Sequence, residues 1–325
     1  MNTVNDLSAS GLGAITVSGH GLHASVLPFG ATLQDLRLAG IDHPLILALP
    51  PDAYREFPMI YAGAVVGRVA GRIAGGSLPW DGGTLNLPVN VGGHHLHGGA
   101  GTFAHRVWTV EDRASDFVTL LYQSPAGEEG YPAAVQARAT YRVLPGPALD
   151  LQFDAVADAD TILNMCHHPY FNLDGSATID NHQLHVPSAG TYLPATKDAV
   201  PTGEIADVSY TPFDFRSPRA VGPHSFDNSL CLNRTAVSPL RHVATLSATG
   251  GPTMTIESTQ AALHIYDGEG IPEGLRDVTG RRLGPRAALA LEAQGWPDAP
   301  NNPHFPSITL KAGQRYTQTV RYAFG

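Results

Sequence analysis

The amino-acid sequence predicts an all-β protein in which antiparallel sheets pack face to face as a large sandwich or barrel. Apolar and polar residues alternate with a period of two in several segments, which is typical of strands with one buried face. No long segment keeps the i, i+3, i+4, i+7 apolar spacing of an amphipathic helix. Strands follow strands across Gly- and Pro-rich turns such as 145–147 and 250–252, which argues against a parallel α/β sheet.

The clearest alternation lies in 135–143, where Val, Ala, Ala, Tyr and Val occupy the odd positions and polar residues the even ones. Leu149, Leu151 and Phe153 alternate with polar residues in the next segment. By the same criterion the expected strands are 22–38, 117–123, 135–143, 149–155, 254–259, 287–294 and 314–324.

The composition fits one large folded unit. The chain has 325 residues, of which 43% are hydrophobic and 15% charged, so it is too apolar for disorder. No linker, fixed-period repeat or shift in composition divides it. We therefore expect a single domain over residues 1–325.

The charge and the absence of targeting signals limit the expected partners and cellular compartment. The net charge is −9 and there is no Lys/Arg cluster, so no nucleic-acid partner is expected. No run of 18 apolar residues predicts a membrane span, and the N-terminal segment lacks the pattern of a secretion signal. The chain has only two cysteines, Cys166 and Cys231, without metal-type spacing. The expected compartment is the reducing cytoplasm.

Glu292 stands out among the polar residues because it lies in an apolar strand, AALALEAQ. A carboxylate is seldom buried without a partner, so its position indicates a cleft. Gln294, Ala288 and Ala290 share its strand face, whereas leucines occupy the other face. This face resembles the floor of a polar pocket.

Residues 164–173, NMCHHPYFNL, place two histidines side by side. If the segment is extended, His168 points with the polar even positions and His167 points towards the core. Pro169 could shift this phase because it cannot donate a ladder hydrogen bond.

Three histidines, His94, His95 and His97, lie among glycines in NVGGHHLHGG. Their spacing suggests a metal site at first sight, but no matched carboxylate or second ligand group accompanies it. We expect no metal at this loop.

Together the motifs resemble the aldose 1-epimerase (galactose mutarotase) family. The resemblance covers nearly the whole chain, with the motifs in the same order. Any one motif is a weak signal, but six in the same order are specific. They are GRVAGRI (67–73), HHLHGG (94–99) followed by Trp108, HHPYFNL (167–173), PTGEI (201–205) with PFDFR (212–216), FDNS (226–229) and LEAQGWPDAPNNPHFPS (291–307).

The resemblance implies a galactose mutarotase-like β-supersandwich that interconverts the α and β anomers of a free aldose, a hexose or a pentose. It implies no cofactor and no metal, a monosaccharide as the partner, and a monomer or homodimer. Glu292 matches the general base and His168 the general acid. The positions matching substrate contacts are Arg72, His97, Tyr170, Asp227 and His264, the last where the family usually has glutamine.

The sequence departs from the family pattern at three positions. Gly71 and His167 stand where the family usually has asparagine, and Trp296 stands where phenylalanine is more usual. We expect the first two to alter the surroundings of the site while leaving the acid/base pair intact. We also expect the carboxylates of Asp227 and Glu292 to favour the charged form of His168.

Three other functions fit parts of the same pattern. A related enzyme could act on a phosphorylated sugar, which would need more basic residues near the cleft. A glycoside hydrolase could use Glu292 and Asp227 as its two carboxylates. A non-catalytic carbohydrate-binding protein could use Trp108 and Trp296 as stacking platforms.

Overall fold

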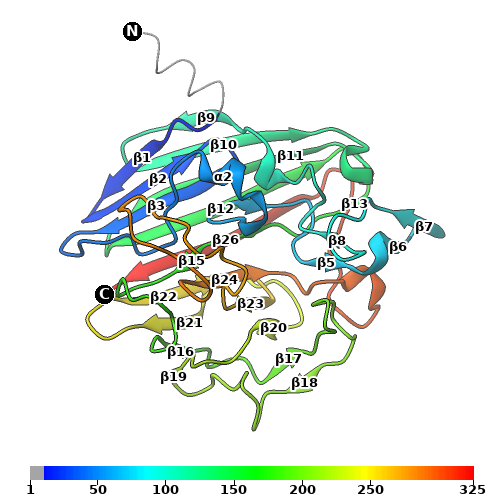
Figure 1. Ribbon diagram of the computed structural model, residues 1–325. Coiled ribbons are helices and arrows are strands. Elements are labelled where there is room, and N and C mark those ends of the chain that lie inside the picture. The colour runs from blue at the N-terminus through cyan, green and yellow to red at the C-terminus, as the bar shows by residue number, and fades with distance from the viewer. Residues whose placement is uncertain (1–10) are drawn as a thin grey trace.

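A computed structural model describes residues 11–325, and its regular structure is almost entirely antiparallel β (Figure 1). The largest sheet has nine strands in the order β19-β16-β21-β22-β26-β12-β11-β10-β9. Their bounds are β19 Arg219–Ala220, β16 Gln183–His185, β21 Arg241–Ser247, β22 Thr253–Ser258, β26 Arg315–Phe324, β12 Ala148–Ala157, β11 Val135–Leu144, β10 Phe117–Ser124 and β9 Thr109–Arg113.

A second sheet has six strands in the order β15-β24-β23-β20-β17-β18, and a third has the order β1-β2-β3. The six strands are β15 Tyr170–Phe171, β24 Leu289–Gln294, β23 Ala262–Tyr266, β20 Asp227–Cys231, β17 Thr191–Leu193 and β18 Ala206–Asp207. The three strands are β1 Ile15–Gly19, β2 Leu22–Leu27 and β3 Thr32–Leu38.

Short elements complete the described part of the chain. Four two-stranded pairs are β14 Cys166–His167 with β4 Val65–Val66, β5 Arg72–Ile73 with β8 His95–Leu96, β6 Ser77–Trp80 with β7 Gly83–Asn86, and β13 Thr161–Ile162 with β25 Thr309–Leu310. The helical turns are α2 Ala53–Glu56, η1 Pro58–Ile60, η2 Ala74–Gly76, η3 Phe103–His105, η4 Glu128–Gly130 and η5 Ala299–Asn301. No helix in residues 11–325 is long and apolar enough to cross a membrane.

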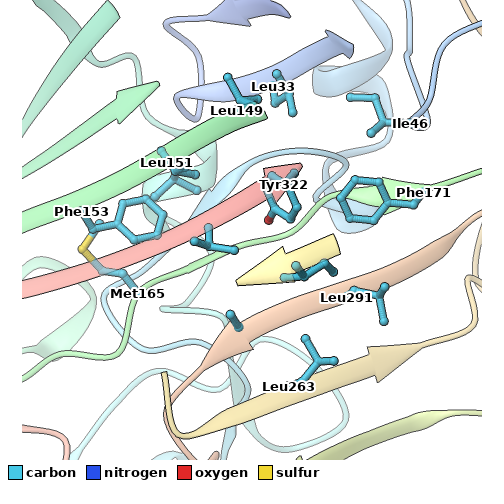
Figure 2. Packing of buried hydrophobic residues seen from close by; sticks show 14 of the residues in the cluster. Leu33, Ile46, Leu149, Leu151, Phe153, Met165, Phe171, Leu263, Leu291 and Tyr322 are labelled. Carbon is cyan, nitrogen blue, oxygen red and sulfur yellow. The ribbon is translucent and has the colours of Figure 1, made fainter. Parts of the chain in front are cut away.

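The main core lies between the nine-stranded and six-stranded sheets (Figure 2). Leu151 of β12 and Tyr322 of β26 contribute from the larger sheet, and Leu263 of β23 and Leu291 of β24 from the smaller one. Burying such side chains between two sheets is the main favourable contribution to folding of this kind of sandwich. The expected all-β sandwich is therefore confirmed.

The expected strands are also confirmed, and their alternation explains their burial. Along β11 the residues are alternately buried and half-buried, and β12 and β26 follow nearly the same pattern. The expected strand over 22–38 is two strands, β2 and β3, because Gly30 and Ala31 take positive φ and turn the chain.

The two faces of β24 have different surroundings. Leu289 and Leu291 belong to the main core, whereas Ala288 and Ala290 pack in a smaller apolar cluster on the opposite side. Period-two alternation therefore turns Glu292 and Gln294 away from the main core. The six-stranded sheet thus separates the core from a cavity on its other face.

Candidate active site

A cavity lies over the strands β20, β23 and β24 of the six-stranded sheet and is closed at its sides by loops. Its polar groups come from segments far apart in the sequence, because neighbouring strands of this sheet are not consecutive in the chain. The cavity is lined by Met59, Tyr61, Gly71, Arg72, Leu96, His97, His168, Tyr170, Ala199, Asp227, His264, Tyr266, Glu292, Gln294 and Pro297.

Glu292 and His168 meet at the floor of this cavity. The Nε2 atom of His168 lies 3.2 Å from Oε1 of Glu292, and both side chains are buried. The Nδ1 atom of His168 is buried and has no hydrogen-bond partner among the described residues. A carboxylate and an imidazole in hydrogen-bond contact can exchange protons with a ligand that enters between them.

The second oxygen of Glu292 also has a partner. The thiol of Cys166 donates a hydrogen bond to Oε2 over 3.4 Å, and Cys166 is fully buried. Burial, together with the neighbouring carboxylate, raises the pKa of the Cys166 thiol well above its usual value, so it stays protonated as a donor. The two oxygens of Glu292 therefore differ, since one faces an imidazole and the other a thiol.

Two opposing effects act on the pKa of His168. Burial lowers it, and although Glu292 and Asp227 both raise it, as expected, the net pKa lies below the usual value of 6.5. The expectation that these carboxylates favour the charged imidazole is confirmed, but they do not determine the net direction. Desolvation outweighs the charge of Glu292 because the ring lies inside the protein.

Asp227, Arg72 and His264 form a second polar group at the cavity. Nε2 of His264 lies 2.9 Å from Oδ1 of Asp227, and an Nη atom of Arg72 lies 3.6 Å from Oδ2. Nδ1 of His264 is 2.9 Å from the hydroxyl of Ser229, which lies on the neighbouring strand β20. Burial lowers the pKa of His264, but Asp227 and Glu292 offset this and the net pKa is raised. Burial acts to raise the pKa of Asp227, but His264 and Arg72 more than offset it, so the net pKa is lowered.

His97 borders the cavity from the loop after β8. Its Nδ1 accepts a hydrogen bond from the backbone N–H of Gly71, 3.2 Å away, and burial holds its pKa well below the usual range. The imidazole is therefore neutral, with its proton on Nε2, where it can donate to a ligand. A Cβ atom at Gly71 would lie 2.7 Å from Cβ of Pro297, so a side chain here would displace that proline.

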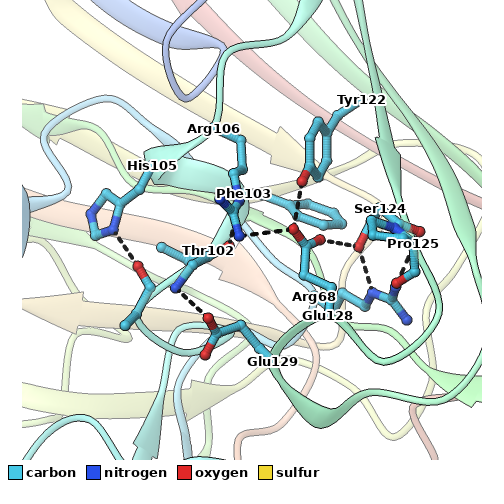
Figure 3. A network of polar contacts seen from close by, with 12 residues as sticks. Arg68, Thr102, Phe103, His105, Arg106, Tyr122, Ser124, Pro125, Glu128 and Glu129 are labelled. Atoms are coloured by element: carbon cyan, nitrogen blue, oxygen red, sulfur yellow. Dashed lines mark hydrogen bonds and ion pairs between the residues drawn. The ribbon is translucent and has the colours of Figure 1, made fainter.

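The loop that carries His97 is held in place by a partly buried polar network (Figure 3). Glu128 accepts hydrogen bonds from Tyr122 and Ser124 and pairs with Arg106 at 3.0 Å. Glu129 accepts from the backbone N–H of Gly101, while Arg68 donates to Ser124. Arg68 and Arg72 are only four residues apart, but the first serves this network and the second the cavity.

Tyr170 contributes its ring to the cavity wall. Its hydroxyl donates to the backbone carbonyl of Ile60 at 2.9 Å, and its ring lies 5.0 Å from that of His168. The structure thus places all seven predicted site residues at one cavity.

Some cavity residues were missed by sequence reasoning. Met59, Tyr61 and Tyr266 lie in no motif, and only the tertiary fold brings them to the cavity. Gln294 was expected on the same face as Glu292 and does line the cavity. Cys166, which contacts Glu292 without lining the cavity, could have been found from strand alternation, which places it on the same face as His168.

Other candidates lie elsewhere. Trp108 and Trp296 are both buried, each donating its indole N–H to a backbone carbonyl, so neither can serve as an exposed stacking platform. His95 contacts the carbonyl of Pro88 and the hydroxyl of Tyr131, whereas Nδ1 of His94 accepts from the backbone N–H of Gly75. The three loop histidines therefore engage separate partners.

The fold and the site together define a class: an all-β sandwich with an acid/base pair at the floor of a polar cavity. Residues 14–323 match the family described as Aldose 1-epimerase. The chain is 37% identical over 274 residues to galactose mutarotase of Sus scrofa, covering 81% of this chain and 79% of that one. It is 30% identical over 322 residues to aldose 1-epimerase of Haemophilus influenzae, covering 94% and 93%.

Solved structures agree with this relationship. A GalM/aldose epimerase homologue from C. elegans superimposes with a TM-score of 0.89 at 30% identity, covering 96% of this chain and 98% of that chain. A galactose 1-epimerase from Lactobacillus acidophilus gives a TM-score of 0.83 at 27% identity, covering 96% and 94%. The chain belongs to the aldose 1-epimerase family.

Proposed function

We propose that the protein interconverts the α and β anomers of a free aldose by opening and reclosing its ring. One observation carries the proposal: a buried carboxylate and a buried imidazole, Glu292 and His168, lie 3.2 Å apart at the floor of a polar cavity. Ring opening of a cyclic hemiacetal needs one base and one acid near the same carbon, and this pair supplies both.

In the forward step Glu292 removes the proton of the anomeric hydroxyl while protonated His168 gives a proton to the ring oxygen. The bond between the anomeric carbon and the ring oxygen breaks, and the former hydroxyl becomes the aldehyde oxygen. Rotation about the adjacent carbon–carbon bond presents the other aldehyde face. Reclosure reverses both proton transfers and leaves the enzyme unchanged.

The lowered pKa of His168 bears on this step in two ways. The protonated imidazole is a stronger acid than usual, which favours transfer to the weakly basic ring oxygen. Its population at neutral pH is smaller, which opposes the gain. General acid catalysis is most effective when these two effects balance near the working pH.

The remaining polar groups suit the hydroxyls of a neutral sugar. Asp227 can accept hydrogen bonds, whereas Arg72 and neutral His97 can donate them. His264 is held between Ser229 and Asp227, in a position to contact the same sugar. Tyr170 forms an aromatic wall beside His168.

The competing functions fit less well. A glycoside hydrolase would need one carboxylic acid to stay protonated, but the pKa of Asp227 is lowered and its oxygens face Arg72 and His264. A phosphorylated sugar would favour several basic residues, but Arg72 is the single Lys or Arg among the described cavity residues and is already paired.

We further propose galactose as one substrate, since several relatives carry the name galactose mutarotase. Residues 1–325 would act as one domain. A reducing, cytoplasmic location is supported by the two cysteines, Cys166 and Cys231, which are both free and buried.

Polarimetry tests the proposal directly. Freshly dissolved α-D-galactose, α-D-glucose and α-D-xylose are followed with and without the protein. The expected result is faster approach to the same final rotation, at a rate proportional to protein concentration. Sugar binding without any acceleration would instead identify a carbohydrate-binding protein.

A further inference from the structure

Gln294 has an unused hydrogen-bonding group inside the cavity. It lies at the end of β24 and its side chain is buried, at 1% exposure. Its Oε1 atom has no hydrogen-bond partner among the described residues. The two carboxylates of the cavity differ in this respect, since Glu292 and Asp227 each have partners on both oxygens.

A buried acceptor without a partner is uncommon in folded proteins and calls for an explanation. The atom itself is not exposed, but it belongs to a residue that lines the cavity, and a half-turn of the amide, which exchanges its oxygen and nitrogen, would let an occupant of the cavity supply the missing donor. A primary amide offers both a donor and an acceptor, and a sugar hydroxyl offers the same two. The two groups are complementary, and an apolar occupant would leave the amide unpaired.

The position of Gln294 relative to Glu292 indicates which part of a sugar it would meet. The two residues are two positions apart on one strand face, which separates their Cα atoms by roughly 7 Å. If Glu292 takes the anomeric hydroxyl, Gln294 lies one step further along the same floor. Its amide can then reach a ring substituent other than the anomeric hydroxyl.

We propose that Gln294 is a specificity-determining residue whose amide binds one non-anomeric hydroxyl of the aldose. This inference rests on the proposed function, because it takes the cavity to be the sugar site. Sites built to bond a substrate hydroxyl discriminate against analogues that lack it, since the buried polar group is then left unpaired. The protein should therefore disfavour one particular deoxy sugar.

The test combines substrate and protein changes. Parent protein and Gln294→Met are compared on galactose and on its 2-, 3-, 4- and 6-deoxy derivatives by polarimetry, after subtraction of the uncatalysed rate. In the parent, one deoxy sugar should show a kcat/KM lower by about tenfold. In Gln294→Met the kcat/KM for that deoxy sugar should lie within about twofold of the kcat/KM for galactose, because no amide remains to be left unpaired.

Two further variants complete the design. Gln294→Asn keeps the amide on a shorter side chain and should lose the same discrimination, which guards against a folding defect specific to methionine. Gln123→Met makes the matched change at an exposed position of β10 and should keep the parent pattern. Unchanged discrimination for all four deoxy sugars in folded Gln294→Met would overturn the proposal.

Calorimetric titration separates this inference from the proposed function. The same sugars are titrated into parent and Gln294→Met, and the affinity ratios are compared. A parent that binds galactose without accelerating mutarotation would refute the proposed epimerase activity. The coupling between Gln294 and one hydroxyl would still be read from the affinities, and equal ratios in both proteins would refute it.

Discussion

His167 and His168 are neighbours in sequence, both buried, and yet they lie on opposite sides of the chain. His167 faces the main core, where its ring nitrogens contact the hydroxyl of Tyr322 at 3.0 Å and the carbonyl of Gly63 at 3.1 Å. His168 faces the cavity, where one nitrogen meets Glu292 and the other has no described partner. The first histidine has a complete set of hydrogen bonds and the second does not.

This contrast explains why burial alone does not identify a functional histidine. Burial lowers the pKa of both rings, to about 3 for His167. Only His168 also lies beside a carboxylate at a cavity. An incomplete set of hydrogen bonds next to an accessible site is therefore the more useful sign of a catalytic role.

The largest expected effect follows from Glu292→Gln. The amide keeps the size of the side chain but cannot accept the anomeric proton, so kcat/KM should fall by about 10²- to 10⁴-fold. Polarimetry with galactose measures the loss, and circular dichroism establishes that the fold is retained. A folded variant with more than about a tenth of parent activity would contradict the assignment of the base.

His168→Asn is expected to have a similar effect, a loss of at least about 10²-fold in turnover, because it removes the proton donor for the ring oxygen. His167→Asn serves as the matched control and should stay within about threefold of the parent, since that ring contacts the core. Equal losses of turnover in the two variants would contradict the assignment of His168 as the acid and of His167 as a core residue.

His167→Asn should instead change stability. An amide is unable to satisfy both Tyr322 and Gly63 in the same geometry, so the free energy of unfolding at pH 7.5 should fall by about 1 to 3 kcal/mol. Urea denaturation measures this difference. An unchanged free energy of unfolding would mean that the hydrogen bonds of the His167 ring make no net contribution to stability.

The stability difference should also depend on pH. The folded pKa of His167 is about 3, below the unfolded value of about 6.5, so the unfolded chain binds the proton first as pH falls. The stability that His167 contributes is complete above pH 6.5 and is lost as pH falls towards 3. The gap between parent and His167→Asn should therefore narrow between pH 7.5 and pH 4.5, and a constant gap would refute this.

The smallest expected effect concerns Cys166, whose thiol contacts Glu292 on the cavity side of the chain. Cys166→Ser replaces a weak donor by a stronger one and should strengthen the hydrogen bond to Oε2 of Glu292. Cys166→Ala removes the donor and should do the reverse. We expect changes of a few fold in kcat, in opposite directions in the two variants. Changes in the same direction would argue for a purely structural role.

Sequence reasoning identified the strands and much of the site because both depend on local patterns. Alternation along 135–143 and 149–155 was sufficient to predict strands whose odd positions are buried. The same alternation separated His168 from His167, and the phase is maintained across Pro169: Phe171 joins the main core and Tyr170 lines the cavity. The family motifs added Arg72, His97, Asp227 and His264.

Some properties of the site could not be predicted from local patterns. The sign of the His168 pKa shift depends on the competition between burial and the charge of Glu292, and burial is known only from the folded chain. The two tryptophans were proposed as platforms, but both pack inside. Exposure is a property of the whole fold, and no local pattern around Trp108 or Trp296 encodes it.

The sequence by itself determined the β architecture and the family, and it predicted which residues act as acid and base, because alternation and motif residues act over a few positions. Only the tertiary structure decided how the site residues lie relative to one another. It brought β15 and β24 together so that His168 and Glu292 meet, placed Cys166 behind the carboxylate, and left Oε1 of Gln294 without a hydrogen-bond partner among the described residues. The physical reason is that distances, burial and completed hydrogen bonds depend on contacts between segments more than a hundred residues apart.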